Sequence, residues 1–229
     1  MEGNLLRPEK ILIATPTVES TKTDFTRSLV TLDCAGYRAV LGMTEQTLVD
    51  HARNDLVRQA IESNCDHILW LDSDMVFEAD TLQRLAKHAE DGLEYVTGIY
   101  FARVFPTVPV ISQWLHCEEG RADNGAEIFT DYPQDSLFEI TASGFGCVLT
   151  KTSLFQEVAR QFKTLPFERV CGLGEDYSFC WRLSQLGKQM WCDSSIKCGH
   201  VGSYTFTEQD YLKQKERIKE NVLRNQTDI

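Results

Sequence analysis

Apolar residues follow two alternating patterns over roughly the first hundred positions of the chain. Short, nearly continuous apolar runs of strand length occupy 11–14, 37–43, 67–71 and 94–101. Between these runs, apolar side chains recur at helical spacing over 48–63 and again from Thr81 onward, where Asp80 or Thr81 is a candidate cap. Strands that alternate with helices are typical of βαβ units. This half of the chain therefore predicts an α/β fold with a mostly parallel central sheet.

The rest of the chain is less regular and predicts a smaller antiparallel portion. Residues 102–136 contain three prolines and an acidic tract, which indicates a long excursion with a short hairpin, of the kind that often serves as a lid. Further elements are expected as a strand over 138–150 interrupted by two glycines, a helix over 151–161, a helix that is opened by 172–176 and stops at Gly187, a short strand at 189–192 and a loop at 196–202. No linker or repeat separates these segments. We therefore predict a single domain over 1–229, with its core at about 9–202 and a charged surface helix at about 207–225.

Composition limits the classes of partner. The chain has 229 residues and a formal net charge of −11, which argues against a general nucleic-acid-binding surface. An anionic substrate would also be repelled by such a protein unless a bound cation offset the charge. The amino-terminal residues lack the apolar region of a signal peptide, and no apolar run approaches the ~20 residues of a membrane span. The expected location is cytoplasmic, without a membrane span.

The eight cysteines are scattered and form no C-x-x-C pair. Cys192, Cys198 and His200 do not match the spacing of common structural zinc sites, so reduced and partly buried thiols are expected. With no signal peptide, we predict no disulfides.

The most informative stretch is the apolar run 67–71, which ends at Asp72-Ser73-Asp74. Residues two apart in a strand point to the same face, so the two carboxylates could share one target. The carboxyl end of a buried strand is where open α/β sheets bind ligands. A divalent cation would offset the repulsion between the carboxylates, and oxygen ligands suit Mg²⁺ or Mn²⁺ with substrate phosphates completing the shell. A solvated turn after an ordinary strand explains the same three residues equally well.

Other candidates are weaker when each is taken alone. Thr15-Pro16-Thr17 ends the first strand, either as a simple turn or with hydroxyls free to bond a ligand, while Arg53 and Asn54 could face solvent or a ligand. Glu175 and Asp176 open a helix, where the dipole stabilises negative charge and a capping role would account for one of them. A lone histidine such as His200 is more often structural than a ligand.

Taken in order, these motifs resemble the GT-A fold glycosyltransferases, particularly family 2-like enzymes that use nucleotide-diphosphate sugars. The resemblance covers most of residues 9–202. It rests on Thr15-Pro16-Thr17, Arg53-Asn54, Asp72-Ser73-Asp74, Gly144-Phe145-Gly146, Gly174-Glu175-Asp176 with Arg182, and His200. It implies a Rossmann-like GT-A fold and an enzyme that moves a sugar from a nucleotide-diphosphate sugar to an acceptor hydroxyl.

The resemblance also implies a role for each motif. Thr15-Pro16-Thr17 would line the nucleobase and ribose pocket, with Arg53, Asn54, Asp72 and Ser73 as further donor-binding residues. Mn²⁺ or Mg²⁺ would be held by Asp74 and His200 with Asp72 nearby, and it would stabilise the departing nucleoside diphosphate. Gly144, Phe145 and Gly146 would let the backbone approach the donor sugar. Asp176 would be the general base of an inverting reaction, beside Glu175.

Several alternatives stay open. The Gly-Gly-Phe-Asp-Glu segment common in family 2 is absent before Glu175, and little chain follows His200 to form an acceptor site. A retaining GT-A enzyme is therefore an alternative, and the acceptor could be a small molecule, a glycan or a modified nucleobase. A phosphatase of the haloacid-dehalogenase type would use Asp72 as its nucleophile, although its motif normally lies at the first strand. A module that binds nucleotide sugars without catalysis is also open.

Two further classes of protein fit the sequence poorly. Nucleotidyltransferases need a Gly-rich basic loop after the first strand, and residues 15–20 contain no glycine. An EF-hand is excluded because the residues after Asp74 lack a third ligand and the turn glycine.

Overall fold

A computed structural model describes residues 9–34, 36–45, 48–118, 121, 124–202 and 204–227. Its central sheet has seven strands in the order β2-β1-β3-β10-β5-β11-β8. The strands are β1 (Lys10–Thr17), β2 (Arg38–Glu45), β3 (His67–Leu71), β5 (Tyr95–Ile99), β8 (Leu137–Ile140), β10 (Cys147–Lys151) and β11 (Met190–Lys197). The pairings make β1, β2, β3, β5 and β11 run in one direction, whereas β10 and β8 oppose their neighbours. The predicted mostly parallel sheet of an α/β fold is confirmed.

Two small sheets flank the central one. One joins β4 (Met75–Val76), β12 (Gly199–Val201) and β13 (Thr205–Phe206), and the other joins β6 (Ile111–His116), β7 (Gly125–Ile128) and β9 (Ala142–Ser143). The hairpin predicted within 102–136 is β6–β7. The loop predicted around His200 is instead strand β12, which pairs with β4.

The strand predicted over 138–150 is in fact three strands, β8, β9 and β10, of which β9 belongs to a small sheet. The bend follows from the buried side chain of Tyr100. A Cβ atom at Gly144 would overlap the Tyr100 hydroxyl, and one at Gly146 would lie 2.9 Å from the Tyr100 ring. The chain can therefore pass Tyr100 only with glycine at these two positions.

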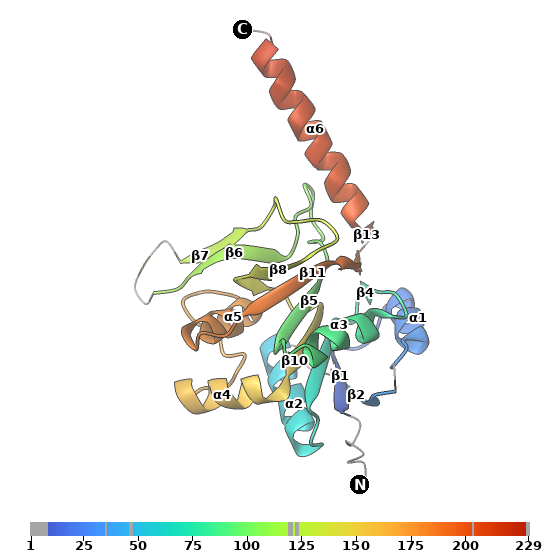
Figure 1. The fold of residues 1–229 in the computed structure, drawn as a ribbon, viewed down its shortest axis with the longest axis vertical. Helices are drawn as coiled ribbons and strands as arrows, with labels where there is room; N and C mark the ends of the chain where they lie inside the picture. Colours follow the sequence, from blue (N-terminus) through green and yellow to red (C-terminus); the bar gives the residue numbers. More distant parts are fainter. Residues whose placement is uncertain are drawn as a thin grey trace.

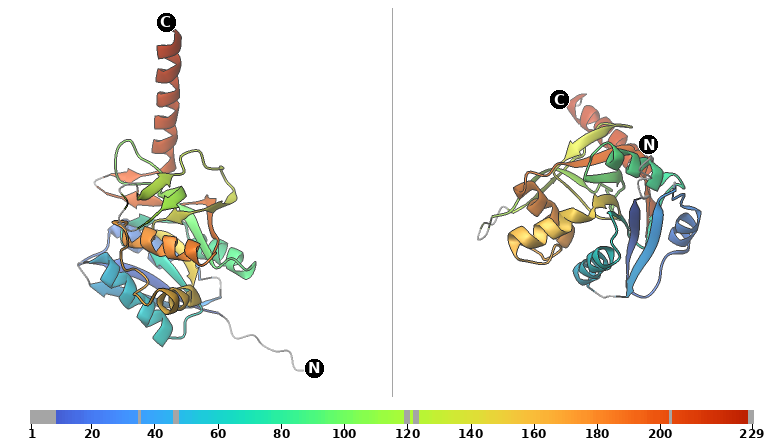
Figure 2. Two further views of the ribbon diagram at one scale, coloured as in Figure 1. Left: turned by 90° about the vertical axis from the view of Figure 1, so that its left-hand side faces the viewer. Right: turned by 60° about the horizontal axis from the view of Figure 1, so that its bottom comes forward.

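In the part of the chain that the structure describes, six helices accompany the central sheet (Figures 1 and 2). They are α1 (Thr23–Thr31), α2 (Val49–Glu62), α3 (Thr81–Glu90), α4 (Thr152–Phe162), α5 (Glu175–Gln185) and α6 (Glu208–Thr227). Apolar residues of α2, α4 and α5 belong to one core cluster, and those of α1 and α3 belong to a second. The two clusters occupy opposite faces of the sheet, as expected for a layered α/β fold. Helix α6 begins against the body, where Tyr211 stacks on Phe101, and then extends away from it (Figure 1).

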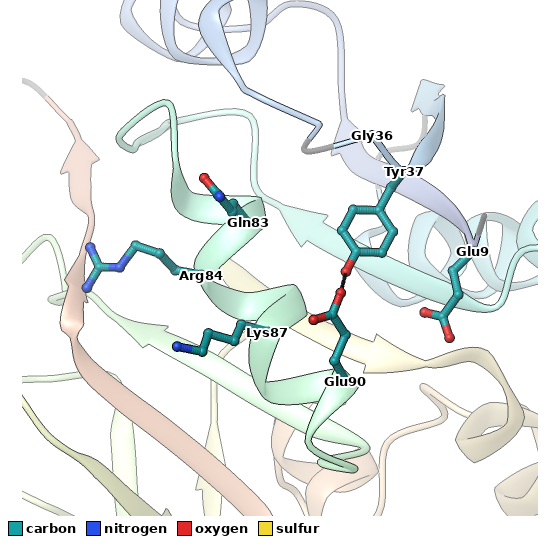
Figure 3. A pocket seen from close by; sticks show the side chains of 7 residues that line it. All are labelled: Glu9, Gly36, Tyr37, Gln83, Arg84, Lys87 and Glu90. Carbon is teal, nitrogen blue, oxygen red and sulfur yellow. Dashed lines mark hydrogen bonds between the residues drawn. The ribbon is translucent and has the colours of Figure 1, made fainter. Parts of the chain in front are cut away.

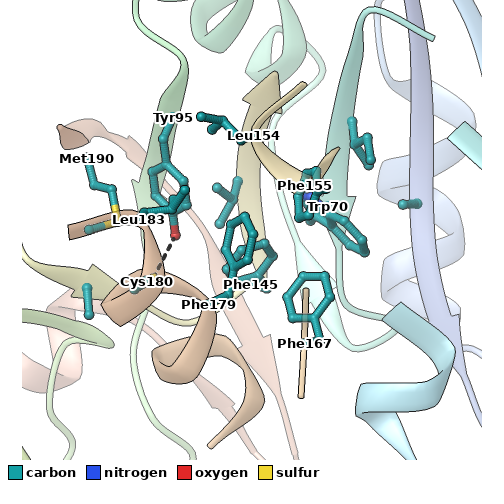
Figure 4. Close-up of a cluster of buried hydrophobic side chains, with 14 of the residues drawn as sticks. Trp70, Tyr95, Phe145, Leu154, Phe155, Phe167, Phe179, Cys180, Leu183 and Met190 are labelled. Atoms are coloured by element: carbon teal, nitrogen blue, oxygen red, sulfur yellow. Dashed lines mark hydrogen bonds between the residues drawn. The ribbon is translucent and has the colours of Figure 1, made fainter. Parts of the chain in front are cut away.

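Aromatic rings form the centre of the larger core (Figure 4). Trp70 packs against both Phe145 and Phe167, with ring centroids 5.5 and 5.3 Å away, and Phe155 stacks on Phe179 at 4.6 Å. Full burial of one such ring contributes about 1.5–3 kcal/mol. This cluster fixes the start of α5 and the loop before it relative to the end of β3.

The structure contains a disulfide between Cys117 and Cys171, so the prediction of no disulfides is wrong. Cys117 follows β6 and Cys171 lies in the loop before α5, and the fold brings their Cα atoms within 5.7 Å. A tertiary contact of this kind leaves no regular spacing in the sequence. Since disulfides persist mainly in oxidising compartments, the cytoplasmic location stays a prediction. Within the described part of the chain, no helix is both long and apolar enough to cross a membrane.

Candidate functional site

Asp72-Ser73-Asp74 lies at the carboxyl end of β3, in the turn that leads to β4. The Asp72 amide donates to the Gly146 carbonyl at 3.2 Å, which ties the turn to the entrance of β10. Arg53 of α2 contacts both Asp72 carboxylate oxygens, at 3.2 and 3.4 Å, and donates to Glu175 at 2.8 Å. Its side chain is only 4% exposed, so this guanidinium is a fixed link between β3 and α5.

Asp74 and His200 come together because β12 pairs with β4. His200 Nε2 lies 3.5 Å from Asp74 Oδ1, and His200 Nδ1 donates to the Phe101 carbonyl at 2.9 Å. The bond to Phe101 orients the ring and turns Nε2 toward the aspartate, as is usual for a metal-binding histidine. Burial acts to raise the pKa of Asp74, but the His200 hydrogen bond and the charges of His200 and Arg103 hold it below its usual value. Asp74 is therefore an ionised carboxylate.

Glu175 and Asp176 form the first turn of α5 and point to different partners. Glu175 is ion-paired with Arg53 and, at 3.5 Å, with Arg169. The Asp176 carboxylate accepts only a 2.8 Å bond from the Tyr177 amide among the described hydrogen bonds. Burial raises the pKa of Asp176 to about 6, although the Arg53 charge acts in the opposite direction. Asp176 can thus take up and release a proton near neutral pH.

These groups lie around two adjoining cavities. The first, which we call the Thr17 cavity, has a volume of about 340 Å³ and is lined by Pro16, Thr17, Val18, Val49, Ala52, Asp72, Ser73, Asp74, Arg103 and His200. The second, the Asp176 cavity, has about 650 Å³ and is lined by Asp72, Tyr100, Ala102, Arg103, Val104, Val110, Phe145, Asp176, His200, Gly202 and Phe206. Asp72, Arg103 and His200 line both. The shared wall is thus the most polar part of the site.

Several predicted residues do not line either cavity. The Thr15 hydroxyl is buried without a hydrogen-bond partner in the described structure, and the Asn54 side chain accepts the Phe167 amide at 3.1 Å. Gly144 and Gly146 accommodate Tyr100, which explains both glycines without a ligand. Their assignment to donor binding stays a prediction.

Arg103 and Tyr100 line the site but were not among the predicted residues. Arg103 belongs to the irregular segment after β5, where no periodic pattern indicates which side chain points inward. The sequence feature that came nearest to indicating Arg103 was the strand predicted over 94–101, because a ligand is expected at the carboxyl end of such a strand.

Two of the three predicted metal ligands meet in this site. Among the described residues, no group of three or more His, Cys, Asp and Glu side chains is spaced to hold a metal ion. Asp74 and His200 are close, whereas Asp72 is held by Arg53. One carboxylate and one imidazole fit Mn²⁺ or Mg²⁺ if substrate phosphates supply the other ligands. Asp72 as a direct ligand stays a prediction.

A larger cavity of about 710 Å³ lies elsewhere, between α3 and the amino ends of β1 and β2 (Figure 3). Tyr37 donates to the Glu90 carboxylate there, while Arg84 and Lys87 extend from α3 to the other side. Open α/β sheets bind ligands at the carboxyl ends of their strands, and this cavity lies at the opposite end. The two cavities around Asp72 are therefore the better candidate site.

Comparisons with known proteins show which fold this is. No protein-family model and no curated protein sequence matches the chain. Among solved structures, it is similar to A197 from STIV, with a TM-score of 0.57, 20% identity, and coverage of 85% of this chain and 86% of that one. It is also similar to GalNAc-T7 with UDP, GalNAc and Mn²⁺, with a TM-score of 0.58, 11% identity, and coverage of 91% of this chain and 47% of that one. The chain therefore has a glycosyltransferase-like fold but spans about half of the GalNAc-T7 chain, and membership of family 2 in particular stays a prediction.

Proposed function

We propose that this protein is a metal-dependent glycosyltransferase that moves a sugar from a nucleotide-diphosphate sugar to an acceptor hydroxyl. The observation that supports this most is the common wall of the two cavities. Asp74 and His200 suit a cation and diphosphate on one side, while Asp176 lies in the second cavity. The GalNAc-T7 structure contains UDP, GalNAc and Mn²⁺, and the same classes of ligand are proposed here.

In this proposal the Thr17 cavity takes the nucleotide, with Pro16 and Thr17 against the base and ribose. Asp74 and His200 would hold Mn²⁺ or Mg²⁺, whose chemistry is to neutralise the departing nucleoside diphosphate. Burial raises the pKa of Asp72, and the Arg53 charge and hydrogen bond oppose that rise and orient the carboxylate. Glu175 has a positioning role, because it holds the Arg53 guanidinium from the other side. Asp176 would accept the proton of the acceptor hydroxyl, because its raised pKa leaves it mostly ionised at pH 7 yet basic enough for proton transfer.

We propose an inverting reaction, in which Asp176 deprotonates the acceptor hydroxyl and this oxygen attacks from the side opposite the leaving group. The products distinguish it from a retaining reaction. NMR of the transferred sugar should show an inverted anomeric configuration, and a retained configuration would remove Asp176 from the role of acceptor base.

Donor binding can be tested without knowing the acceptor. In a thermal-shift panel of nucleoside diphosphates with and without Mn²⁺, at least one nucleotide should stabilise the protein only when the metal is present. Asp74→Ala should abolish that shift, because it removes one of the two assembled ligands. A nucleotide that binds equally well in EDTA, or to the Asp74→Ala protein, would contradict metal-dependent donor binding.

A further inference from the structure

Arg103 lines both cavities and forms an ion pair with Asp74, the proposed metal ligand. Its Nη1 atom lies 2.6 Å from Asp74 Oδ2 and 3.4 Å from the Val201 carbonyl. Arg103 comes from the segment between β5 and β6, and its side chain is 45% exposed despite these contacts. Among the described residues that line either cavity, it is the single arginine or lysine, and it lines both.

The two arginines at this site, Arg53 and Arg103, differ in how easily each can change its ion-pair partner. Arg53 is buried and held by Asp72 and Glu175, so a change of partner would leave buried carboxylates unpaired at high cost. Among the described ion pairs, Arg103 has one carboxylate partner, and much of its side chain is in contact with solvent. A guanidinium has five N–H donors in a planar fork that matches phosphate oxygens. Arg103 can therefore leave Asp74 at low cost if another anion arrives.

We propose that Arg103 exchanges partners when the donor binds, and this inference rests on the function proposed above. In the free protein Arg103 pairs with Asp74 and holds that carboxylate in place. Asp74 would bind the divalent cation, whose charge would repel the guanidinium, and Arg103 would then donate its hydrogen bonds to the donor diphosphate. The diphosphate must approach the cation at Asp74, so its oxygens arrive beside a side chain that already contacts this carboxylate.

The exchange predicts that loss of the Arg103 side chain changes the affinities for the cation and for the nucleotide in opposite directions. Removal of Arg103 removes a competitor of the cation but also removes a donor to the diphosphate. In Arg103→Ala, affinity for Mn²⁺ alone should rise by about twofold to fivefold, the range of an exposed ion pair. Affinity for a nucleoside diphosphate at saturating Mn²⁺ should fall by about tenfold or more, because charge-assisted hydrogen bonds to phosphate are lost.

The two affinities can be measured separately. Free Mn²⁺ is followed by electron paramagnetic resonance in the absence of nucleotide, and UDP and GDP binding are measured by calorimetry at saturating Mn²⁺. Arg103→Lys keeps the charge without the planar fork, so its Mn²⁺ affinity should stay near that of the native protein and its nucleotide affinity should lie between native and Arg103→Ala. Arg58→Ala is the matched control, because Arg58 also pairs with an aspartate at 3.0 Å but is 65% exposed on α2 and lines neither cavity. It should change neither affinity.

Unchanged or weaker Mn²⁺ binding by Arg103→Ala would overturn the exchange, as would native affinity for the nucleotide. The same shifts in Arg58→Ala would also overturn it, since net charge alone would then explain them. Failure of the proposed function looks different, because the native protein would then bind neither nucleotide even at saturating Mn²⁺.

Discussion

At the scale of single residues, two opposing effects act on the pKa of Asp176. Its carboxylate lies at a helix start, which favours charge, but its burial raises its pKa to about 6. An aspartate whose folded-state pKa lies above the unfolded value of about 3.8 costs stability once it ionises. That cost is absent below about pH 4, grows as pH rises through 6 and is constant above. A group kept in this state against stability is typical of a catalytic position.

The first prediction concerns Asp176→Asn. At pH 7 it should be more stable than the native protein by about 1–3 kcal/mol, and the difference should vanish near pH 4. Urea unfolding across this pH range measures it without any substrate. A constant difference at all pH values would show that the ionised carboxylate is not the cause.

The same substitution should lower sugar transfer by about 10²–10⁴-fold, the usual contribution of a general base. Native activity should rise with pH through about 6 and then level off, because only the ionised form of Asp176 accepts a proton. Metal-dependent nucleotide binding should be nearly unaffected. Transfer at the native rate by Asp176→Asn would remove the residue from this role.

Glu175→Gln provides the contrasting case. It breaks a buried ion pair with Arg53, so it should destabilise the protein by about 3–5 kcal/mol while affecting the chemical step less than Asp176→Asn. Thermal unfolding and transfer rates of the two variants, measured side by side, test the assignment. A stability gain for Glu175→Gln would contradict the positioning role.

At the scale of elements, the bend between β9 and β10 depends on the approach of the backbone to Tyr100. Gly144→Ala should destabilise the protein by about 1–3 kcal/mol, because the added Cβ overlaps the Tyr100 hydroxyl and lies 2.9 Å from Val110 Cγ1. Gly125→Ala in β7 is the matched control, since its Cβ would meet open space, and it should change stability by less than about 0.5 kcal/mol. Equal effects in urea unfolding would show that the Tyr100 contact does not determine this bend.

The strands β1, β2, β3 and β5 and the helices α2 and α3 between them could be predicted from the sequence because their lengths are ones that apolar periodicity can resolve, whereas β8 and β10 were predicted as a single strand. The meeting of Asp74 with His200 could not, since it depends on β4 and β12, which have two and three residues and therefore no readable period. Family resemblance supplied that pairing instead. Arg103 and the Cys117–Cys171 bridge were missed for a related reason: both lie in irregular segments whose partners are distant in the sequence.

At the scale of the whole molecule, the Cys117–Cys171 bridge ties the β6–β7 hairpin to the loop that precedes α5. Closing a loop with a sequence separation of 54 residues stabilises the folded state by about 4 kcal/mol in the chain-entropy estimate. A reducing agent should therefore lower the melting temperature of the native protein. The Cys117→Ser, Cys171→Ser double variant should melt at that lower temperature with or without reductant. Denatured, unreduced native protein should show two thiols fewer than its eight cysteines, and eight free thiols would rule out the bridge.

The place of β10 in the sheet also has a consequence for how the chain folds. β10 lies between β3 and β5, yet both are synthesised well before it. Until residues 147–151 leave the ribosome, β3 and β5 each present an unpaired edge to solvent. Such late, non-local pairing slows folding and leaves a nascent chain prone to aggregation. We therefore expect ribosome-bound chains that end before β10 to be protease-sensitive throughout the sheet, and a protected core to form only after the whole of β10 has emerged.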